Sequence, residues 1–258
     1  MGLSRSPLKL ARDTYTLDLD IDRALPLALP ATYRILYTAP PAQQHDVDVR
    51  LARLLGMLIP VPRRFVYIST TGVYGDCGGA LVAEDQAVNP QSGRARLRVA
   101  AEQALDSWCE LHGVDLVVLR VPGIYGPGRL GVERIRAGSA NIREADANPG
   151  NRIHVDDLVR CCEAAMSDAI PAGIYNVGDG DNRSATWFAA EVARQCGLGA
   201  PPTISREEAE HGFSPMRLSF LGESRRIDTT KMREVLGVTP RYADPADGIA
   251  ASLSADES

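Results

Sequence analysis

The chain has 258 residues, 45% of them hydrophobic and 24% charged, so it can bury the core of one large domain, with or without an appendage. Its formal net charge of −5 argues against a protein that attracts nucleic acid or an anionic membrane by the electrostatic field of the whole molecule. No apolar run approaches the roughly 20 residues that cross a bilayer, and the start shows no secretory signal. Five cysteines without C-x-x-C spacing indicate reduced thiols and no metal site. Together these features predict a cytoplasmic protein that does not bind nucleic acid or a membrane surface through its overall charge.

Short apolar runs of strand length alternate with longer helical patterns in the first half of the chain. Runs rich in β-branched and aromatic residues predict strands at 14–19, 33–37, 64–68 and 115–121. Apolar residues that recur every three or four positions predict helices at 44–59 and 94–112. This alternation is typical of βαβ units, in which a parallel sheet is covered by helices on both faces.

After residue 127 the predicted elements become shorter. They are a helix at 132–137, a loop at 138–150, a strand at 153–155, a helix at 158–166, a strand at 174–177 and helices at 186–196 and 228–236. Asp156 or Asp157 is placed to cap the helix that follows it. The sequence therefore predicts a Rossmann-type, doubly wound α/β fold. Residues 1–128 would form an incomplete core of this type, and residues 129–258 the remaining sheet elements and a small substrate-side region.

The segment over residues 65–76 carries the first functional signal. A buried strand runs directly into Ser69, Thr70 and Thr71, which places three hydroxyl groups at its carboxyl end. A hydroxyl there can hydrogen-bond a substrate oxygen while a neighbouring acid protonates that oxygen. Ordinary Ser/Thr turns at strand ends explain the segment equally well, so it does not decide the function alone.

Taken with five later segments, this one resembles the extended short-chain dehydrogenase/reductase superfamily, specifically its NAD-dependent epimerase/dehydratase branch. The later segments are 90–102, 119–128, 153–158, 173–178 and 226–237, and the resemblance covers roughly residues 18–253. It implies NAD or NADP as the cofactor, a small polar or sugar-like substrate, and a possible homodimer through helices 44–59 and 94–112. It leaves the choice between NAD and NADP open.

The resemblance also implies which residues form the site. The expected catalytic residues are Thr70, Arg94 and Arg98. The expected cofactor-binding residues are Asp18, Leu19, Thr38, Ala39, Pro40, Ser69, Arg98, Pro122, Gly123 and Ile124. The expected substrate-binding residues are Thr71, Tyr74, Tyr125, Arg225 and Arg226. The last two are adjacent guanidinium groups, which suit a phosphate or carboxylate but are equally consistent with a solvated pair near a helix.

The predicted catalytic helix departs from the family pattern of Tyr-x-x-x-Lys followed by Glu four residues later. Alignment on Glu102 puts Arg94 at the Tyr position and Arg98 at the Lys position. Arg98 can still hold a ribose hydroxyl. Arg94 cannot transfer the proton, because a guanidinium group does not titrate near neutral pH. A solvated basic face explains these arginines as well, and Tyr74 or Tyr125 would be the substitute acid.

The start of the chain is the second departure. The family begins with a strand, a Gly-x-x-Gly-x-x-Gly turn and a helix whose N-terminus holds the pyrophosphate. No such segment precedes residue 14, so we expect the first βαβ unit to be missing and cofactor binding to be weak or absent. The G-x-G-x-x-G pattern at 126–131 is not a substitute, because the predicted helix after it is too short for a crossover.

Three functional hypotheses remain open after the sequence analysis. The leading one is an NAD(P)-dependent oxidoreductase or epimerase in which Arg-x-x-x-Arg replaces Tyr-x-x-x-Lys. The second is a non-catalytic relative that binds a nucleotide or metabolite as a sensor or scaffold. The third is a truncated chain without activity of its own.

Overall fold

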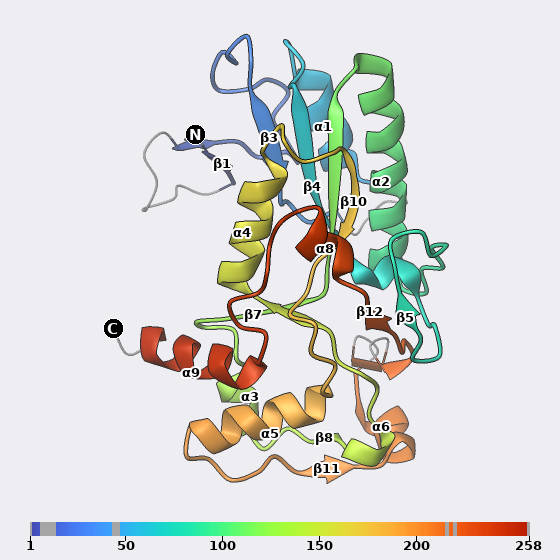
Figure 1. Cartoon of the computed structure of the whole chain (residues 1–258), viewed down its shortest axis with the longest axis vertical. Helices are drawn as coiled ribbons and strands as arrows, with labels where there is room; N and C mark the ends of the chain where they lie inside the picture. Colours follow the sequence, from blue (N-terminus) through green and yellow to red (C-terminus); the bar gives the residue numbers. More distant parts are fainter. Residues whose placement is uncertain (1, 6–13, 43–46, 215–216, 219–220, 257–258) are drawn as a thin grey trace.

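Four parallel strands form the main sheet of the protein, in the order β10-β6-β4-β3. The computed structural model describes residues 2–5, 14–42, 47–214, 217–218 and 221–256. The sheet strands are β3 (Arg34–Tyr37), β4 (Arg64–Thr70), β6 (Asp115–Val121) and β10 (Gly173–Asn176). Figure 1 shows them side by side in the upper half of the molecule. The predicted parallel sheet is confirmed.

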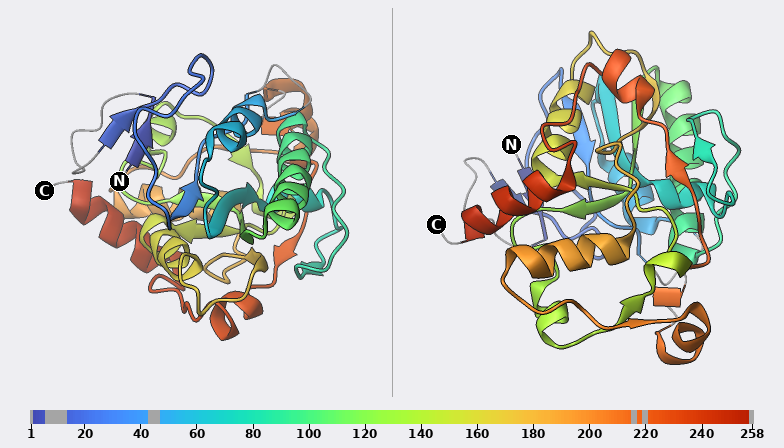
Figure 2. Two further views of the ribbon diagram at one scale, coloured as in Figure 1. Left: turned by 90° about the horizontal axis from the view of Figure 1, so that it is seen from above. Right: turned by 60° about the horizontal axis from the view of Figure 1, so that its bottom comes forward.

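Helices cover both faces of this sheet, as Figure 2 shows from above. On one face, α1 (Val49–Met57) and α2 (Gly93–His112) pack on β3, β4 and β6 through a shared apolar cluster. On the other face, α4 (Val155–Ala165) and α8 (Thr230–Glu234) pack on β6 and β10. Helix α2 begins at Ser92, whose hydroxyl accepts from the backbone N–H of Ala95, and ends at Gly113, which has a left-handed conformation (φ 65°). The doubly wound α/β fold is therefore confirmed.

Shorter elements complete the chain, many of them below the carboxyl ends of the strands. The two-stranded pairs are β7 (Gly123–Tyr125) with β9 (Arg152–His154), β8 (Asn141–Ile142) with β11 (Thr203–Ile204), and β5 (Leu81–Val82) with β12 (Arg226–Ile227). The helical elements are η1 (Thr71–Tyr74), α3 (Val132–Arg136), η2 (Glu144–Asp146), α5 (Ala185–Gln195), α6 (Arg206–Gly212) and α9 (Pro245–Asp256). Helices α3, α5 and α9 share an apolar cluster, so this region has a small core of its own.

The N-terminal segment differs from the prediction. Strand β2 (Thr14–Thr16) stops earlier than residue 19, and it pairs with β1 (Gly2–Ser4), a strand that the sequence analysis missed. The strand ends because the Asp18 carboxylate accepts from the backbone N–H of Asp20 at 2.9 Å and turns the chain. These two strands form a sheet separate from the main one.

Three predictions for the second half were also inaccurate. The segment predicted as a loop at 138–150 contains the short elements β8 and η2. Neither Asp156 nor Asp157 caps α4; the helix starts earlier, and the ring of His154 accepts from the backbone N–H of Asp156 at 3.2 Å. The Asp157 carboxylate instead accepts from the backbone N–H groups of Arg241 and Tyr242. The helix predicted at 228–236 is shorter, since α8 covers only Thr230–Glu234. In the described part of the chain, no helix combines the length and the apolar character that a membrane span needs.

Candidate functional site

The carboxyl ends of β3, β4 and β6 meet at one edge of the main sheet. Thr70, the last residue of β4, lies opposite Val121, the last residue of β6, which is followed by Pro122. On the other side of β4, Tyr37 ends β3 and leads into Thr38, Ala39 and Pro40. In doubly wound sheets this edge is where ligands bind, so the structure brings together the core of the predicted cofactor site.

Thr70 also begins the short helix η1. Its hydroxyl oxygen accepts from the backbone N–H of Gly72 at 3.2 Å, and its side chain is half-buried. The hydroxyl hydrogen of such a residue can still be donated, because a hydroxyl is both a donor and an acceptor. Thr71, one residue later, is buried, so its side chain is less accessible at this edge than Thr70.

Arg98 reaches the same edge from the first half of α2. Its Nη1 donates to the carbonyl oxygen of Ile68 at 2.8 Å and to the hydroxyl of Tyr67 at 2.9 Å. The guanidinium carbon lies 5.4 Å from the centre of the Tyr67 ring. Both acceptors are neutral, and among the residues that the structure describes Arg98 forms no salt bridge. Its positive charge is therefore held in place without an ion pair.

A buried ion pair fastens α2 to the strands behind this edge. Both oxygens of the Glu102 carboxylate accept from Arg120 on β6, the shorter distance being 2.7 Å. The hydroxyl of Ser69 donates to the same carboxylate. Ser69 therefore points into the protein, and it can support the site through Glu102 but does not face a ligand at the edge.

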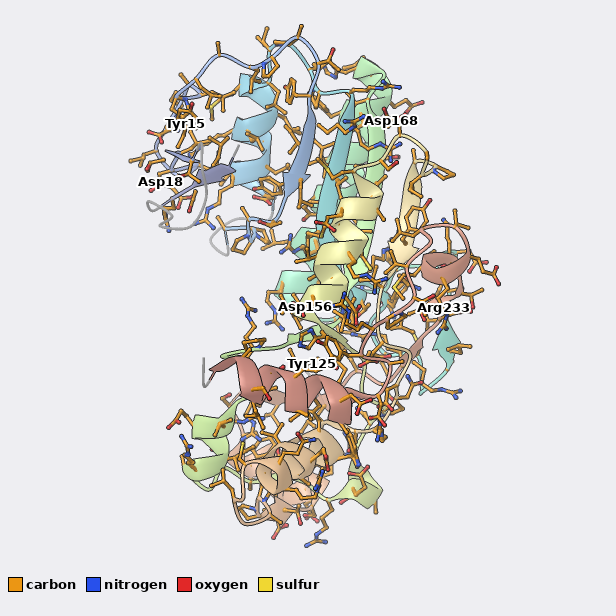
Figure 3. The ribbon with its side chains drawn as sticks, turned by 60° about the vertical axis from the view of Figure 1, so that its left-hand side comes forward. Tyr15, Asp18, Tyr125, Asp156, Asp168 and Arg233 are labelled. Atoms are coloured by element: carbon orange, nitrogen blue, oxygen red, sulfur yellow. The ribbon has the colours of Figure 1, made fainter. Side chains whose placement is uncertain are left out.

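The two tyrosines considered as substitute acids are both buried. The Tyr74 hydroxyl donates to the side chain of Asn176 at 2.7 Å, and the loss of solvation raises the pKa of Tyr74. Burial likewise raises the pKa of Tyr125. Tyr125 packs edge-on against His154 and Phe188, and Figure 3 shows it beside α9, well below the main sheet. Neither hydroxyl is placed or tuned to protonate a substrate at the strand ends.

The remaining predicted residues lie in three other places. Asp18 pairs with Arg5 at 3.1 Å, and the carbonyl of Leu19 accepts from Arg53, so both belong to the N-terminal segment. Figure 3 shows Asp18 and Tyr125 in opposite halves of the molecule. Gly123 and Ile124 belong to β7 and pair with β9.

Arg225 and Arg226 have different surroundings although they are adjacent. The guanidinium of Arg225 donates to the Gly75 carbonyl at 2.7 Å and pairs with Glu223 at 2.8 Å. Arg226 is exposed and donates to the carbonyl of Gly79. Arg225 is thus already paired with a carboxylate, which weakens the case for a phosphate between the two arginines.

Some contacts at the site were not visible in the sequence. Tyr67, Arg120 and Asn176 come from three strands and are joined to α2 and η1 only by tertiary packing. No spacing pattern links Tyr67 to Arg98. The glycine-rich turn at 126–131 lies between β7 and α3, a helix of five residues, which supports its rejection as a dinucleotide fingerprint. Within the described ranges, no group of three or more His, Cys, Asp or Glu side chains could hold a metal ion.

The chain is similar in sequence to two curated enzymes. It is 29% identical over 194 residues to a dTDP-glucose 4,6-dehydratase of Streptomyces niveus, covering 72% of this chain and 55% of that protein. It is 33% identical over 214 residues to a UDP-glucose 4-epimerase of Mycolicibacterium smegmatis, covering 78% and 63%. The chain thus spans less than two thirds of the length of these relatives.

Solved structures show the same fold. A functionally unknown conserved protein from Silicibacter pomeroyi DSS is 31% identical, with a TM-score of 0.81 over 100% of this chain and 90% of that one. MoeE5 in complex with UDP-glucose and NAD has a TM-score of 0.76 at 20% identity, over 98% and 88%. The model of the NAD dependent epimerase/dehydratase family matches residues 18–178. This chain therefore belongs to the NAD dependent epimerase/dehydratase family.

Proposed function

We propose that the chain is an NAD-linked oxidoreductase or epimerase that acts on a small polar, sugar-nucleotide-like substrate at the carboxyl edge of its main sheet. The observation that carries this proposal is the position of Arg98. Its guanidinium is held at the edge by two neutral oxygens, so its charge remains available to oxygen atoms of a bound nucleotide. The relatives support the choice of ligand, since they include a UDP-glucose 4-epimerase and a protein solved with UDP-glucose and NAD.

The residues at the edge fit part of such a cofactor. Arg98 would hold a ribose hydroxyl, and the backbone of Thr38 to Pro40 would line the cofactor beside β3. The half-buried hydroxyl of Thr70 would hydrogen-bond the reacting oxygen of the substrate. NAD, when bound, would supply the hydride acceptor. Among the described residues, no glycine-rich turn adjoins β3, and we therefore expect the chain to bind the dinucleotide weakly.

A second function, binding without catalysis, is favoured by the surroundings of the candidate acids in the described part of the chain. By alignment on Glu102, Arg94 would stand at the position of the family's tyrosine, and the hydroxyl of Tyr74 is buried and donates to Asn176. General acid catalysis typically contributes roughly 10²–10⁴-fold to a rate, so its loss separates an enzyme from a binding protein. In that case the chain would be a nucleotide- or metabolite-binding sensor or scaffold.

Both functions require that a nucleotide binds beside Arg98, and a binding measurement suited to weak complexes tests this requirement. Saturation-transfer NMR with NAD should give signals for the wild type, and Arg98→Ala should weaken binding by about tenfold or more. Arg98→Lys, which restores the residue type of the family, should retain binding. Arg96→Ala is the matched control, because Arg96 lies on the same helix, is exposed and donates to the Gln91 carbonyl. Equal binding by wild type and Arg98→Ala would exclude this site.

Turnover then distinguishes the two functions. The wild type is incubated with NAD and UDP-glucose, and NADH or an epimerised product is followed by absorbance and by NMR. Catalysis that is lost on Thr70→Val, with NAD binding retained, supports the enzyme. Binding without any turnover supports the sensor or scaffold.

A further inference from the structure

A groove of about 700 Å³ runs along the face of the sheet that carries α2. Its floor is apolar and comes from Leu116 and Val118 on β6 and Ile174 on β10. One wall is α2 itself. Neither Thr70 nor Arg98 lines this groove, which shares with the candidate site only the Glu102–Arg120 ion pair behind the edge. The lining residues on α2 are Val99, Glu102, Gln103, Asp106, Cys109 and Glu110.

The groove exists because one strip of the sheet is covered on only one side. A parallel sheet normally buries both of its faces under helices. Strand β10 packs against α8 on the opposite face, whereas α2 packs on β4 and β6. On the α2 side of the sheet, α1 and α2 pack mainly on β3, β4 and β6, and no other helix in the described part of the chain covers β10 there. Leu116 and Ile174 consequently remain half-buried.

The wall of the groove carries a column of carboxylates. Glu102, Asp106 and Glu110 follow one another at intervals of four residues, so they share one side of α2. Glu102 is neutralised by Arg120. Asp106 and Glu110 are exposed, and neither forms a salt bridge with any residue that the structure describes. The rim of the groove therefore carries two negative charges above an apolar floor.

These charges are placed where they do not stabilise the helix. Like charges four residues apart repel each other in an α-helix. Glu110 also lies in the last turn of α2, where the helix dipole favours cations. A basic partner would relieve both effects, and apolar side chains of the same partner would cover the floor.

We propose that this groove binds a basic amphipathic helix of a partner protein. The apolar side of that helix would pack on Leu116, Val118 and Ile174, and its Lys or Arg residues would pair with Asp106 and Glu110. The stretch of α2 from Val99 to Glu110 rises about 16 Å at 1.5 Å per residue, which accommodates about three turns of a partner helix. The proposal does not depend on NAD binding or turnover.

The test uses a synthetic helical peptide of 18 residues with Leu along one side and Lys along the adjacent side. Fluorescence anisotropy should show that this peptide binds the wild-type chain, and that a peptide with Glu in place of Lys does not. A third peptide with Gln in place of Leu should also fail, because the floor requires apolar side chains. Binding should weaken as salt is raised, since the paired charges are at the rim.

Matched charge variants locate the binding surface. The double substitution Asp106→Lys with Glu110→Lys should lower the affinity of the chain for the basic peptide by about tenfold or more. Glu207→Lys with Glu234→Lys makes the same change in net charge on α6 and α8, away from the groove, and should leave binding unchanged. The groove variant should melt no lower than the wild type, because a lysine at position 110 suits the helix dipole and a lysine at position 106 lies four residues from Glu102. No binding by the wild type, or equal loss in both double variants, would overturn the proposal.

Discussion

Asp179 is a buried carboxylate whose replacement should stabilise the protein in a pH-dependent way. It follows β10, is 3% exposed, and accepts from the backbone N–H of Asp181 through Oδ1 at 2.9 Å. Its other oxygen, Oδ2, is buried without a hydrogen-bond partner in the described structure. The nearby guanidinium of Arg152 pairs with Asp181 at 3.0 Å instead. Burial consequently raises the pKa of Asp179 from 3.8 to about 7.

The sign of the effect follows from proton linkage. The folded state holds the Asp179 proton more tightly than the unfolded state, so the free energy of unfolding falls as pH rises from about 4 to about 7. The pKa of Asp179 differs by about three units between the folded and unfolded states, and each unit is worth 1.36 kcal/mol. Ionisation of Asp179 therefore lowers the free energy of unfolding by about 4 kcal/mol once the pH is above 7. Asp179→Asn keeps the acceptor for Asp181 and removes the titration. The gain in stability from this substitution should therefore be about 2–3 kcal/mol larger at pH 8 than at pH 5.

Urea unfolding followed by the fluorescence of Trp108 and Trp187 measures this difference at the two pH values. Asp181→Asn is the control, because the Asp181 carboxylate pairs with both Arg152 and Arg183 and its loss should destabilise the protein at pH 8. If Asp179→Asn changes the free energy of unfolding equally at both pH values, or stabilises the protein less at pH 8 than at pH 5, then folding does not raise the pKa of Asp179 and the reasoning is refuted.

Four further predictions concern the site, the core and assembly. Arg94→Tyr combined with Arg98→Lys should raise turnover of a sugar nucleotide roughly 10²-fold, as measured by NADH formation, and no gain would show that the acid belongs elsewhere. Glu102→Ala should cost about 3–5 kcal/mol in urea unfolding, because it leaves the Arg120 charge buried and unpaired; a loss below 1 kcal/mol would contradict this. Gly75→Ala should destabilise by about 1–3 kcal/mol or more, since φ is 68° and a Cβ would lie 2.0 Å from the Asn89 carbonyl oxygen; an unchanged melting temperature would argue against that turn. Leu111 is 79% exposed on α2, and we expect light scattering to give twice the monomer mass of 27.8 kDa, whereas a monomer at tens of micromolar would remove the homodimer.

The sequence alone was sufficient to predict the strands of the main sheet and the helices that cover it. Runs such as 64–68 and 115–121 are rich in β-branched and aromatic residues over a strand length, and α2 has both a capping serine and a terminal glycine. These are local signals, which act within a few residues of the chain. The family resemblance could also be recognised, because an ordered set of short motifs is encoded along the chain.

Elements held by distant partners could not be predicted in the same way. Strands β8 and β11 are two residues long, as are β5 and β12, and each exists only because its partner lies beside it in space. Strand β1 needs β2 for the same reason. Two residues carry too little periodicity to be distinguished from a loop.

The site shows the same division between local and tertiary information. The sequence placed Thr70 at a strand end and Arg98 on a helix, and the family resemblance assigned both residues to one site. Only the tertiary structure decided where each side chain goes: Ser69 to Glu102, Tyr74 to Asn176, and Arg98 to neutral oxygens. The reason is that hydrogen-bond partners and burial depend on packing between elements far apart in the chain, whereas strand and helix formation depend on neighbouring residues.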